Sequence, residues 1–253
     1  MQRVNHVETL PPEELKFLTD LMSATSFKKW NADAQQGWDE LASNPNGAHG
    51  VRVFRGHLVM LNLSGCGLCG KLPDSVGQCK QLEKLILHNN RTQPKGSKSG
   101  QGITGQIPAS IAGCESLERL DLSQNSIEGQ IPVGLSELAQ LDGLYLYDNK
   151  LAGSIPSELG ALEKLQYLYL GDNALTGEIP AELTALRQLR HFIAFNNKLT
   201  GEVPPAFGDL QKLEILWLFQ GEQEAEWTTE TADSHPSCLT GATQDLLGEA
   251  LWY

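Results

Sequence analysis

The chain has 253 residues and lacks both a long apolar run and a visible targeting segment. No run of about 18 or more apolar residues occurs, which argues against a membrane-spanning helix. The first twenty residues contain no apolar segment of the kind found in signal peptides. We therefore expect no membrane insertion and a cytoplasmic location, with a secreted protein whose signal has been removed as the alternative.

Motifs for catalysis and for metal binding are also missing. The sequence contains no nucleophile elbow, phosphate-binding loop or HExxH element. Of five cysteines, only Cys66 and Cys69 have CxxC spacing, and no second pair completes a zinc site. His88 and His191 lie in distant segments and do not form a dyad with each other. These absences predict a protein that is not an enzyme and that uses no cofactor or metal ion.

Basic residues are scarce relative to acidic ones. The chain has 19 Lys and Arg against 31 Asp and Glu, which gives a net charge of −12. Residues 221–253 contain acids but no Lys or Arg, and the rest of the chain is only mildly acidic. A surface of this charge is not attracted to phosphates or anionic lipids. The composition therefore argues against nucleic-acid and membrane-surface partners.

What the sequence does contain is a unit of 24 residues that recurs along most of its length. Its copies begin at Leu58, Leu82, Leu117, Leu141, Leu165, Leu189 and Leu213. A fixed period of this length is typical of a solenoid, in which stacked units share one continuous core. The second copy carries an insertion at 91–101 that is rich in Gly, Ser and Lys. This composition predicts a tolerated surface loop, or alternatively a basic flap beside a binding face.

The array divides the chain into three parts. We expect residues 1–57 to form an N-terminal helical cap, residues 58–220 to carry about seven repeats, and residues 221–253 to form an acidic loop and a divergent C-terminal cap. The apolar spacing at 243–252 predicts a short amphipathic helix that closes the far end of the solenoid. An abrupt loss of the repeat pattern after residue 220 motivates a further alternative, a truncated product.

The N-terminal cap has its own signals. Pro12 and two acids open a stretch whose spaced apolar residues predict a helix through about Ser26. Trp30 and Trp38 follow this stretch and are expected to anchor the cap.

Within each unit, positions 1, 4, 6, 11, 15, 19 and 22 are apolar. In the fourth copy these are Leu141, Leu144, Leu146, Leu151, Ile155, Leu159 and Leu162. Alternation at positions 4 and 6 predicts a strand, and stacking joins the strands into a parallel sheet. Position 9 is asparagine in five copies: Asn90, Asn125, Asn149, Asn173 and Asn197. We expect these amides to satisfy backbone groups inside the coil and to bind no ligand.

Three cysteines stand where other copies of the repeat have asparagine or leucine. Cys66 takes the asparagine position in the first copy, whereas Cys79 and Cys114 replace the leucine of position 22. A cysteine at a core leucine position is expected to be a buried free thiol. A disulfide between Cys79 and Cys114 is the alternative, although parallel side chains fit disulfide geometry poorly.

The consensus LxxLxLxxNxLxGxIPxxLxxL resembles the plant-type leucine-rich repeat. Its GxIP element is present at 105–108, 129–132, 153–156 and 177–180, with close variants at 70–73 and 201–204. The resemblance covers residues 58–220 and implies an α/β fold, a right-handed superhelical solenoid with a parallel concave sheet. It also implies that the segments containing Ile-Pro form a second sheet.

The cap departs from that of plant receptor ectodomains, which carry PCxWxGVxC before the first repeat. Here the matching stretch is 45–53, in which Asn46 and Val53 stand for the two cysteines and Ala48 for the tryptophan. The cap therefore lacks the disulfide that the family pattern implies. With Trp30 and Trp38, it looks more like the stand-alone repeat proteins of algae and protists. Polygalacturonase inhibitors share the repeat but are secreted and disulfide-capped.

Function is expected on the concave face, where positions 3, 5, 7 and 8 are free of core packing. From the fourth copy onward these positions become aromatic, and a contiguous aromatic surface of this kind is typical of a binding site. The predicted ligand-binding residues are Tyr145, Tyr147, Tyr167, Tyr169, His191, Ile193, Phe195, Trp217 and Phe219, with Asp148 and Asp172 at the rim. We expect a monomer that binds a protein or peptide here, and expect Tyr145→Ala with Tyr169→Ala to abolish binding without loss of the fold.

Alternatives to this hypothesis concern both the residues and the ligand. Ile215, Trp217 and Phe219 lie near the end of the array, and contact with a C-terminal cap would explain their apolar character equally well. Aromatic faces also stack on sugars, so carbohydrate recognition is the second hypothesis. The third is an orphan or purely structural repeat protein.

Overall fold

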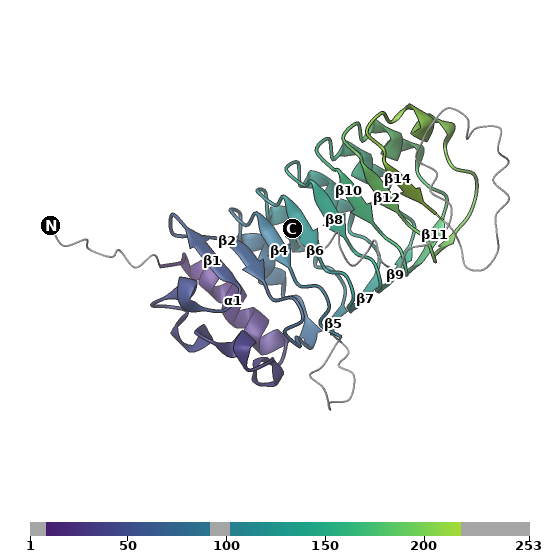
Figure 1. The fold of residues 1–253 in the computed structure, drawn as a ribbon. Helices are drawn as coiled ribbons and strands as arrows, with labels where there is room; N and C mark the ends of the chain where they lie inside the picture. Colours follow the sequence, from purple (N-terminus) through teal and green to yellow (C-terminus); the bar gives the residue numbers. More distant parts are fainter. Residues whose placement is uncertain (1–8, 92–101, 219–253) are drawn as a thin grey trace.

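We describe a computed structural model of the chain over residues 9–91 and 102–218 (Figure 1). Three predictions fall outside these ranges: the insertion beyond Arg91, the placement of Phe219, and the C-terminal cap at 221–253 with its helix at 243–252. The described residues form an elongated stack of coils that begins with a helical cap (Figure 1).

One long sheet runs along the whole stack. Its strands, in spatial order, are β1 (Val51–Phe54), β2 (His57–Asn62), β4 (Lys84–Ile86), β6 (Arg119–Asp121), β8 (Gly143–Tyr145), β10 (Tyr167–Tyr169), β12 (His191–Ile193) and β14 (Ile215–Trp217). β1 and β2 are antiparallel, and every later pair is parallel. Tyr145 pairs with Tyr169, and Tyr169 pairs with Ile193. Equivalent positions of successive repeats therefore lie in columns across the sheet, as the period predicted.

A second parallel sheet also runs along the array. Its strands are β3 (Gly70–Lys71), β5 (Ile103–Gly105), β7 (Ser126–Gly129), β9 (Lys150–Gly153), β11 (Ala174–Gly177) and β13 (Lys198–Leu199). These strands stop short of the Ile-Pro dipeptides, which corrects the expectation from the family resemblance. β9, for example, ends at Gly153, ahead of Ile155 and Pro156. Proline has no N–H to donate to a sheet, and its φ of −64° suits the turn that follows.

Each of the four Ile-Pro dipeptides, and the Leu-Pro and Val-Pro at the equivalent places of the first and sixth repeats, leads into one turn of 3₁₀-helix. These turns are η5 (Asp74–Gln78), η6 (Ala109–Gly113), η7 (Val133–Glu137), η8 (Ser157–Ala161), η9 (Ala181–Ala185) and η10 (Pro205–Asp209). They stack on one another along the array, as successive η elements are in contact. The coil therefore closes through a strand, a second strand and a short helical turn.

The predicted core positions are confirmed. All seven residues of the fourth copy, from Leu141 to Leu162, are buried, and six of them are completely so. Cys79 and Cys114 are buried free thiols, as expected, and burial raises the pKa of Cys114 to about 12.

The asparagine ladder is confirmed in detail. Asn149 Nδ2 donates to the carbonyl oxygens of Leu122 at 3.0 Å and Leu146 at 3.1 Å, and Asn149 Oδ1 accepts from the N–H of Ile127 at 3.0 Å. One amide thus links two successive coils. Cys66, at the same position of the first repeat, donates through Sγ to Ser64 O at 3.4 Å.

The N-terminal cap is organised around α1 (Pro12–Ala24), which begins with Pro12 in its first turn as predicted. Four short 3₁₀ turns follow: η1 (Phe27–Lys29), η2 (Asp33–Gln35), η3 (Trp38–Glu40) and η4 (Pro45–Gly47). α1 packs against η5, the first 3₁₀ turn of the array. Trp30 and Trp38 are buried with their ring centroids 5.0 Å apart, so their role as cap anchors is confirmed.

The two positions that carry cysteines in the family pattern are in contact here. Asn46 Oδ1 accepts from the N–H of Val53 at 2.6 Å, and Asn46 Nδ2 donates to Val53 O at 3.4 Å. A side-chain clasp of two hydrogen bonds thus joins η4 to β1, at the place where the family pattern has a disulfide.

Candidate functional site

The structure brings the predicted aromatic residues together on one face of the long sheet. We call this cluster the aromatic floor; it consists of Tyr145, Tyr147, Tyr167, Tyr169, Ile193, Phe195, Ile215 and Trp217. The cluster is separate from the main core. Columns of equivalent positions on β8, β10, β12 and β14 place these side chains next to one another.

Two glycines let the rings lie against the sheet. A Cβ added to Gly143 would come within 2.6 Å of Cε2 of Tyr145, and one added to Gly171 would come within 2.8 Å of Cε1 of Phe195. Both distances are far below van der Waals contact, so each ring occupies the space that a side chain would fill. The rings therefore cover backbone instead of standing away from it, and the sequence pattern did not predict this arrangement.

Several residues of the aromatic floor are more buried than the prediction of an exposed binding patch implied. Tyr145 and Tyr147 are each 8% exposed, Tyr169 is 5% exposed and Ile193 is 4% exposed. The predicted double replacement of Tyr145 and Tyr169 by alanine would therefore remove packing as well as any ligand contact, so it is no longer expected to be neutral for the fold. The partly exposed members are Tyr167, Phe195, Ile215 and Trp217.

Ring contacts tie the floor together. Tyr145 stacks on Tyr167 at 6.3 Å and meets Tyr169 edge-on at 5.0 Å, and Phe195 stacks on Trp217 at 4.3 Å. Such pairs add roughly 0.5–1.5 kcal/mol each beyond the area they bury. The ring contacts therefore hold the side chains of the floor in place. Trp217 is part of the floor through its contact with Phe195.

His191 joins the floor through hydrogen bonding. Its Nδ1 lies 2.7 Å from Tyr169 Oη, and its Nε2 lies 3.4 Å from Glu214 Oε2. Burial lowers the pKa of His191, although Glu214 opposes this effect. The neutral imidazole with its proton on Nε2 fits both contacts, because Nδ1 then accepts from the tyrosine. Burial also raises the pKa of Tyr169 to about 12, so the floor carries no charge near neutral pH.

Arg119 marks the border of the aromatic floor. Its guanidinium carbon lies 4.4 Å from the centroid of the Tyr145 ring, and its Nη2 lies 3.4 Å from Asp121 Oδ2. A guanidinium over an aromatic face is held by the ring quadrupole.

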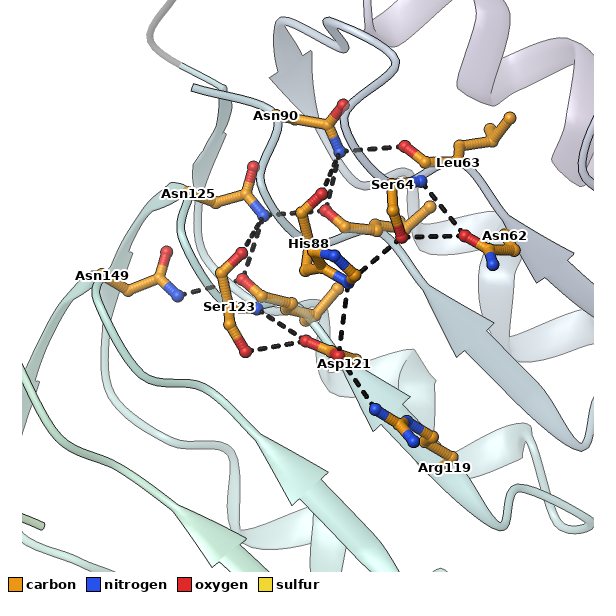
Figure 2. A network of polar contacts seen from close by, with 12 residues as sticks. Asn62, Leu63, Ser64, His88, Asn90, Arg119, Asp121, Ser123, Asn125 and Asn149 are labelled. Atoms are coloured by element: carbon orange, nitrogen blue, oxygen red, sulfur yellow. Dashed lines mark hydrogen bonds and ion pairs between the residues drawn. The ribbon is translucent and has the colours of Figure 1, made fainter. Parts of the chain in front are cut away.

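Beyond Arg119 the concave face carries a polar network (Figure 2). Asp121 is completely buried, and its Oδ1 accepts from Ser123 Oγ at 2.7 Å. Its Oδ2 lies 3.5 Å from His88 Nδ1, which is also 3.1 Å from Ser64 Oγ. Burial alone would raise the pKa of Asp121, but the hydrogen bonds from His88 and Ser123 outweigh it and lower the pKa.

This network contains a serine, a histidine and an aspartate in contact. However, Ser64 and Asp121 both approach the same ring nitrogen of His88. A nucleophilic triad needs them on opposite nitrogens, so the geometry is that of a structural network.

Asp148 and Asp172 have a backbone role that the sequence pattern did not predict. Both are left-handed, with φ of 54° and 53°, and so are the residues at the same position of other repeats: Gly65, Asn89, Gln124 and Asn196. Asp, Asn and Gly are the residues that adopt this conformation most readily. The Asp148 carboxylate pairs with Arg91, and Asp172 Oδ1 accepts from Asn196 Nδ2 at 2.6 Å. Both acids lie one residue beyond the concave column, and their role at the rim of a binding site stays a prediction.

Within residues 9–91 and 102–218, no group of three or more His, Cys, Asp or Glu side chains could hold a metal ion. Among the same residues, no helix is both long enough and apolar enough to cross a bilayer.

Comparison with known families decides the class of the protein. The family model named Leucine Rich Repeat matches residues 57–79, 116–138, 164–186 and 188–210. The chain contains leucine-rich repeats. Among curated proteins, no sequence matches the chain.

Solved structures similar to this leucine-rich-repeat chain are plant receptor ectodomains. The PEPR1–AtPEP1 complex matches with a TM-score of 0.72 at 28% identity, over 83% of this chain and 28% of that chain. Another match is the ectodomain of the Arabidopsis thaliana receptor kinase GASSHO1/SCHENGEN3 in complex with CASPARIAN STRIP INTEGRITY FACTOR 2. Its TM-score is 0.65 at 29% identity, over 82% of this chain and 26% of that chain. The repeats are therefore of the plant type.

The leucine-rich-repeat chain spans about a quarter of the length of these first receptor chains. A similar structure of comparable length is a chain of the Arabidopsis thaliana BIR3–SERK2 complex, where the match covers 74% of this chain and 95% of that chain. Its TM-score is 0.54 at 27% identity. The fold is thus shared with both long and short leucine-rich-repeat ectodomains.

Proposed function

We propose that this protein is a non-catalytic module that binds another protein or a peptide through its concave face. The observation that carries the proposal is the aromatic floor itself. Eight residues from four successive repeats form a cluster outside the core, and Gly143 and Gly171 leave room for its rings. Tyrosine and tryptophan are the residues most often found as binding hot spots.

Similar structures support this choice of ligand class. One is described as a plant peptide hormone receptor, RGFR1, in complex with RGF2, and matches at 33% identity over 59% of this chain and 22% of that chain. Another is the complex of BIR3 with SERK2. The proposed contact residues are those predicted from the sequence. Among them, Tyr167, Phe195 and Trp217 are partly exposed, so a ligand would contact these side chains first.

The test is affinity capture from the native source, followed by a binding measurement with the purified partner. We expect Tyr167→Ala to weaken binding about tenfold or more, as is common for an interface aromatic residue. Because Tyr167 is only partly buried, circular dichroism should show a retained fold. The matched control is Val133→Ser, which removes an apolar side chain that is 53% exposed on η7, away from the concave strands. Equal affinity of Tyr167→Ala and the wild type would contradict the proposal.

Carbohydrate recognition is the second candidate. The observation that favours it is that the rings lie along the sheet, since flat aromatic faces also stack on sugars. Binding on a glycan array, abolished by Tyr167→Ala, would support this alternative, whereas a captured protein or peptide would support the first. If well-folded material bound neither, a structural role would be favoured.

A further inference from the structure

A row of side chains borders the aromatic floor where the chain enters each strand. These are the second residues of successive repeats: Glu83, Glu118, Asp142, Gln166, Arg190 and Glu214. Their backbones are linked from one repeat to the next. Glu118 O accepts from the N–H of Asp142 at 2.8 Å, and Asp142 O accepts from the N–H of Tyr167 at 3.1 Å. The row therefore runs along one edge of β4 to β14, which lie side by side in Figure 1.

The first half of this row carries negative charge without a matching cation. Glu83, Glu118 and Asp142 form no ion pair within the part of the chain that the structure describes, whereas Arg190 lies 2.5 Å from Glu214 farther along. Burial and the nearby Glu118 raise the pKa of Asp142, against the smaller opposite effects of Lys84 and Arg119. Lys84 and Arg119 thus act on the Asp142 carboxylate only from a distance, and neither forms an ion pair with it among the described residues.

A groove opens at this part of the row. It has a volume of about 340 Å³ and is lined by Glu118, Gln140, Asp142, Lys164, Gln166 and Gln188. The one cation in its lining, Lys164, donates to Gln140 and forms no ion pair with either acid among the described residues. Gln166 precedes Tyr167 in the chain, so the groove adjoins the partly exposed edge of the aromatic floor.

The floor also accepts a guanidinium, as Arg119 shows by its position over the Tyr145 ring. Within a short distance, the concave face therefore offers apolar ring surface, ring faces that attract cations, and two carboxylates that lack a partner. A ligand complementary to all three features carries positive charge next to an apolar side chain.

We propose that the occupant of the concave face is a basic peptide segment, whose Lys or Arg side chain enters the groove between Glu118 and Asp142 while a neighbouring apolar side chain packs on Tyr167. This inference rests on the proposed function and specifies its ligand. It assigns to Glu118 and Asp142 a role in selecting charge.

The test uses three synthetic peptides that share one aromatic residue and differ only in its neighbours, which are Lys and Arg, Gln, or Glu. Binding to the full chain is followed by fluorescence anisotropy. We expect the basic peptide to bind at least about tenfold more tightly than the neutral one, the acidic peptide to bind most weakly, and the preference to shrink as salt is raised.

The decisive variant is Glu118→Gln with Asp142→Asn, which keeps side-chain shape and removes two charges. This variant should bind the basic peptide about tenfold more weakly than the wild type does, and its affinity for the neutral peptide should be unchanged. Asp142 already bears a burial penalty as a carboxylate, so the amide should not harm the fold, and thermal unfolding checks this. Glu178→Gln with Glu202→Gln is the control, since it removes two exposed charges outside the row.

The outcomes separate this inference from the proposed function. If the neutral peptide bound as well as the basic one, and Tyr167→Ala weakened both, the peptide-binding function would stand and the charge preference would be wrong. An affinity for the basic peptide that is unchanged in the Glu118 and Asp142 variant would also overturn the inference. If none of the three peptides bound, both proposals would fail.

Discussion

At the scale of single residues, Asn173 shows how one side chain holds two coils together. Its Nδ2 donates to the carbonyl oxygens of Leu146, Leu170 and Gly171 at 3.0–3.1 Å, and its Oδ1 accepts from the N–H of Leu151 at 3.0 Å. An amide offers two N–H donors and a separate carbonyl acceptor, whereas the hydroxyl of a side chain of similar size, such as threonine, has only one proton to donate. Removing it leaves four backbone groups without this partner.

We expect Asn173→Ala to lower the free energy of unfolding by about 1–3 kcal/mol, the usual cost of buried polar groups that lose their partners. Urea unfolding followed by circular dichroism measures the difference. Thr176→Ala, an exposed position three residues later on β11, serves as the control and should change little. An Asn173→Ala protein as stable as the control would show that water replaces the amide without cost.

At the same scale, some assignments followed from the sequence and others did not. The ladder was predictable because one residue type recurs at one position of the period. The left-handed conformation at Asp148 and Asp172 was not recognised, although Gly65, Asn89 and Asn196 at the same position carry the signal. The recurrence of Gly, Asn and Asp at this repeat position indicates that the backbone must be left-handed there, in addition to the predicted rim of acids.

At the scale of elements, the floor depends on strands that present an aromatic residue beside a glycine. Gly171 follows β10, and the ring of Phe195, from the next repeat, lies over it and stacks on Trp217. The column pattern predicted which residues share the face. It did not predict their burial. The rings of Tyr145 and Phe195 lie flat only because a glycine in the same or the preceding repeat leaves space for them.

We expect Gly171→Ala to displace Phe195 and to disturb its stacking on Trp217. The free energy of unfolding should fall by about 1–3 kcal/mol, as is usual when a packed site is overfilled. Near-ultraviolet circular dichroism reports the loss of fixed aromatic packing. The control is Gly208→Ala, where an added Cβ meets no atom within 4 Å. Identical aromatic spectra for the two variants would contradict the arrangement.

At the scale of the whole molecule, the concave face divides into a polar half and an aromatic half. Period and column identity predicted that division, the solenoid and its parallel sheet, and the proline and spaced apolar residues near the N-terminus predicted the helical cap. The contact between Asp121 and His88 could not be predicted, because it joins different columns of neighbouring repeats, one of which is lengthened by the insertion. Networks of this kind depend on side-chain reach across repeats, which a consensus does not record.

The polar half should influence stability in acid. The pKa of Asp121 is lowered in the folded state, so its stabilising effect is complete above the unfolded-state value of about 3.9 and is lost as pH falls through the lower folded-state value. We expect Asp121→Asn to be less stable than the wild type near neutral pH by about 1–3 kcal/mol. This difference should narrow below about pH 4.

Thermal unfolding of both proteins across this pH range measures the gap. Asp209→Asn, at an exposed position on η10, is the matched control for removal of one carboxylate. A gap between Asp121→Asn and the wild type that stays constant into acid would show that the carboxylate contributes nothing specific to its charge.

The hydrogen-bonded clasp between Asn46 and Val53 changes how the cap depends on its surroundings. A disulfide at this place would form only when two cysteine thiols were oxidised after synthesis, and a reducing environment would reopen it. The amide clasp closes when the backbone reaches its final position, and thiol–disulfide exchange cannot undo it. Closure of this end of the solenoid is therefore insensitive to redox potential.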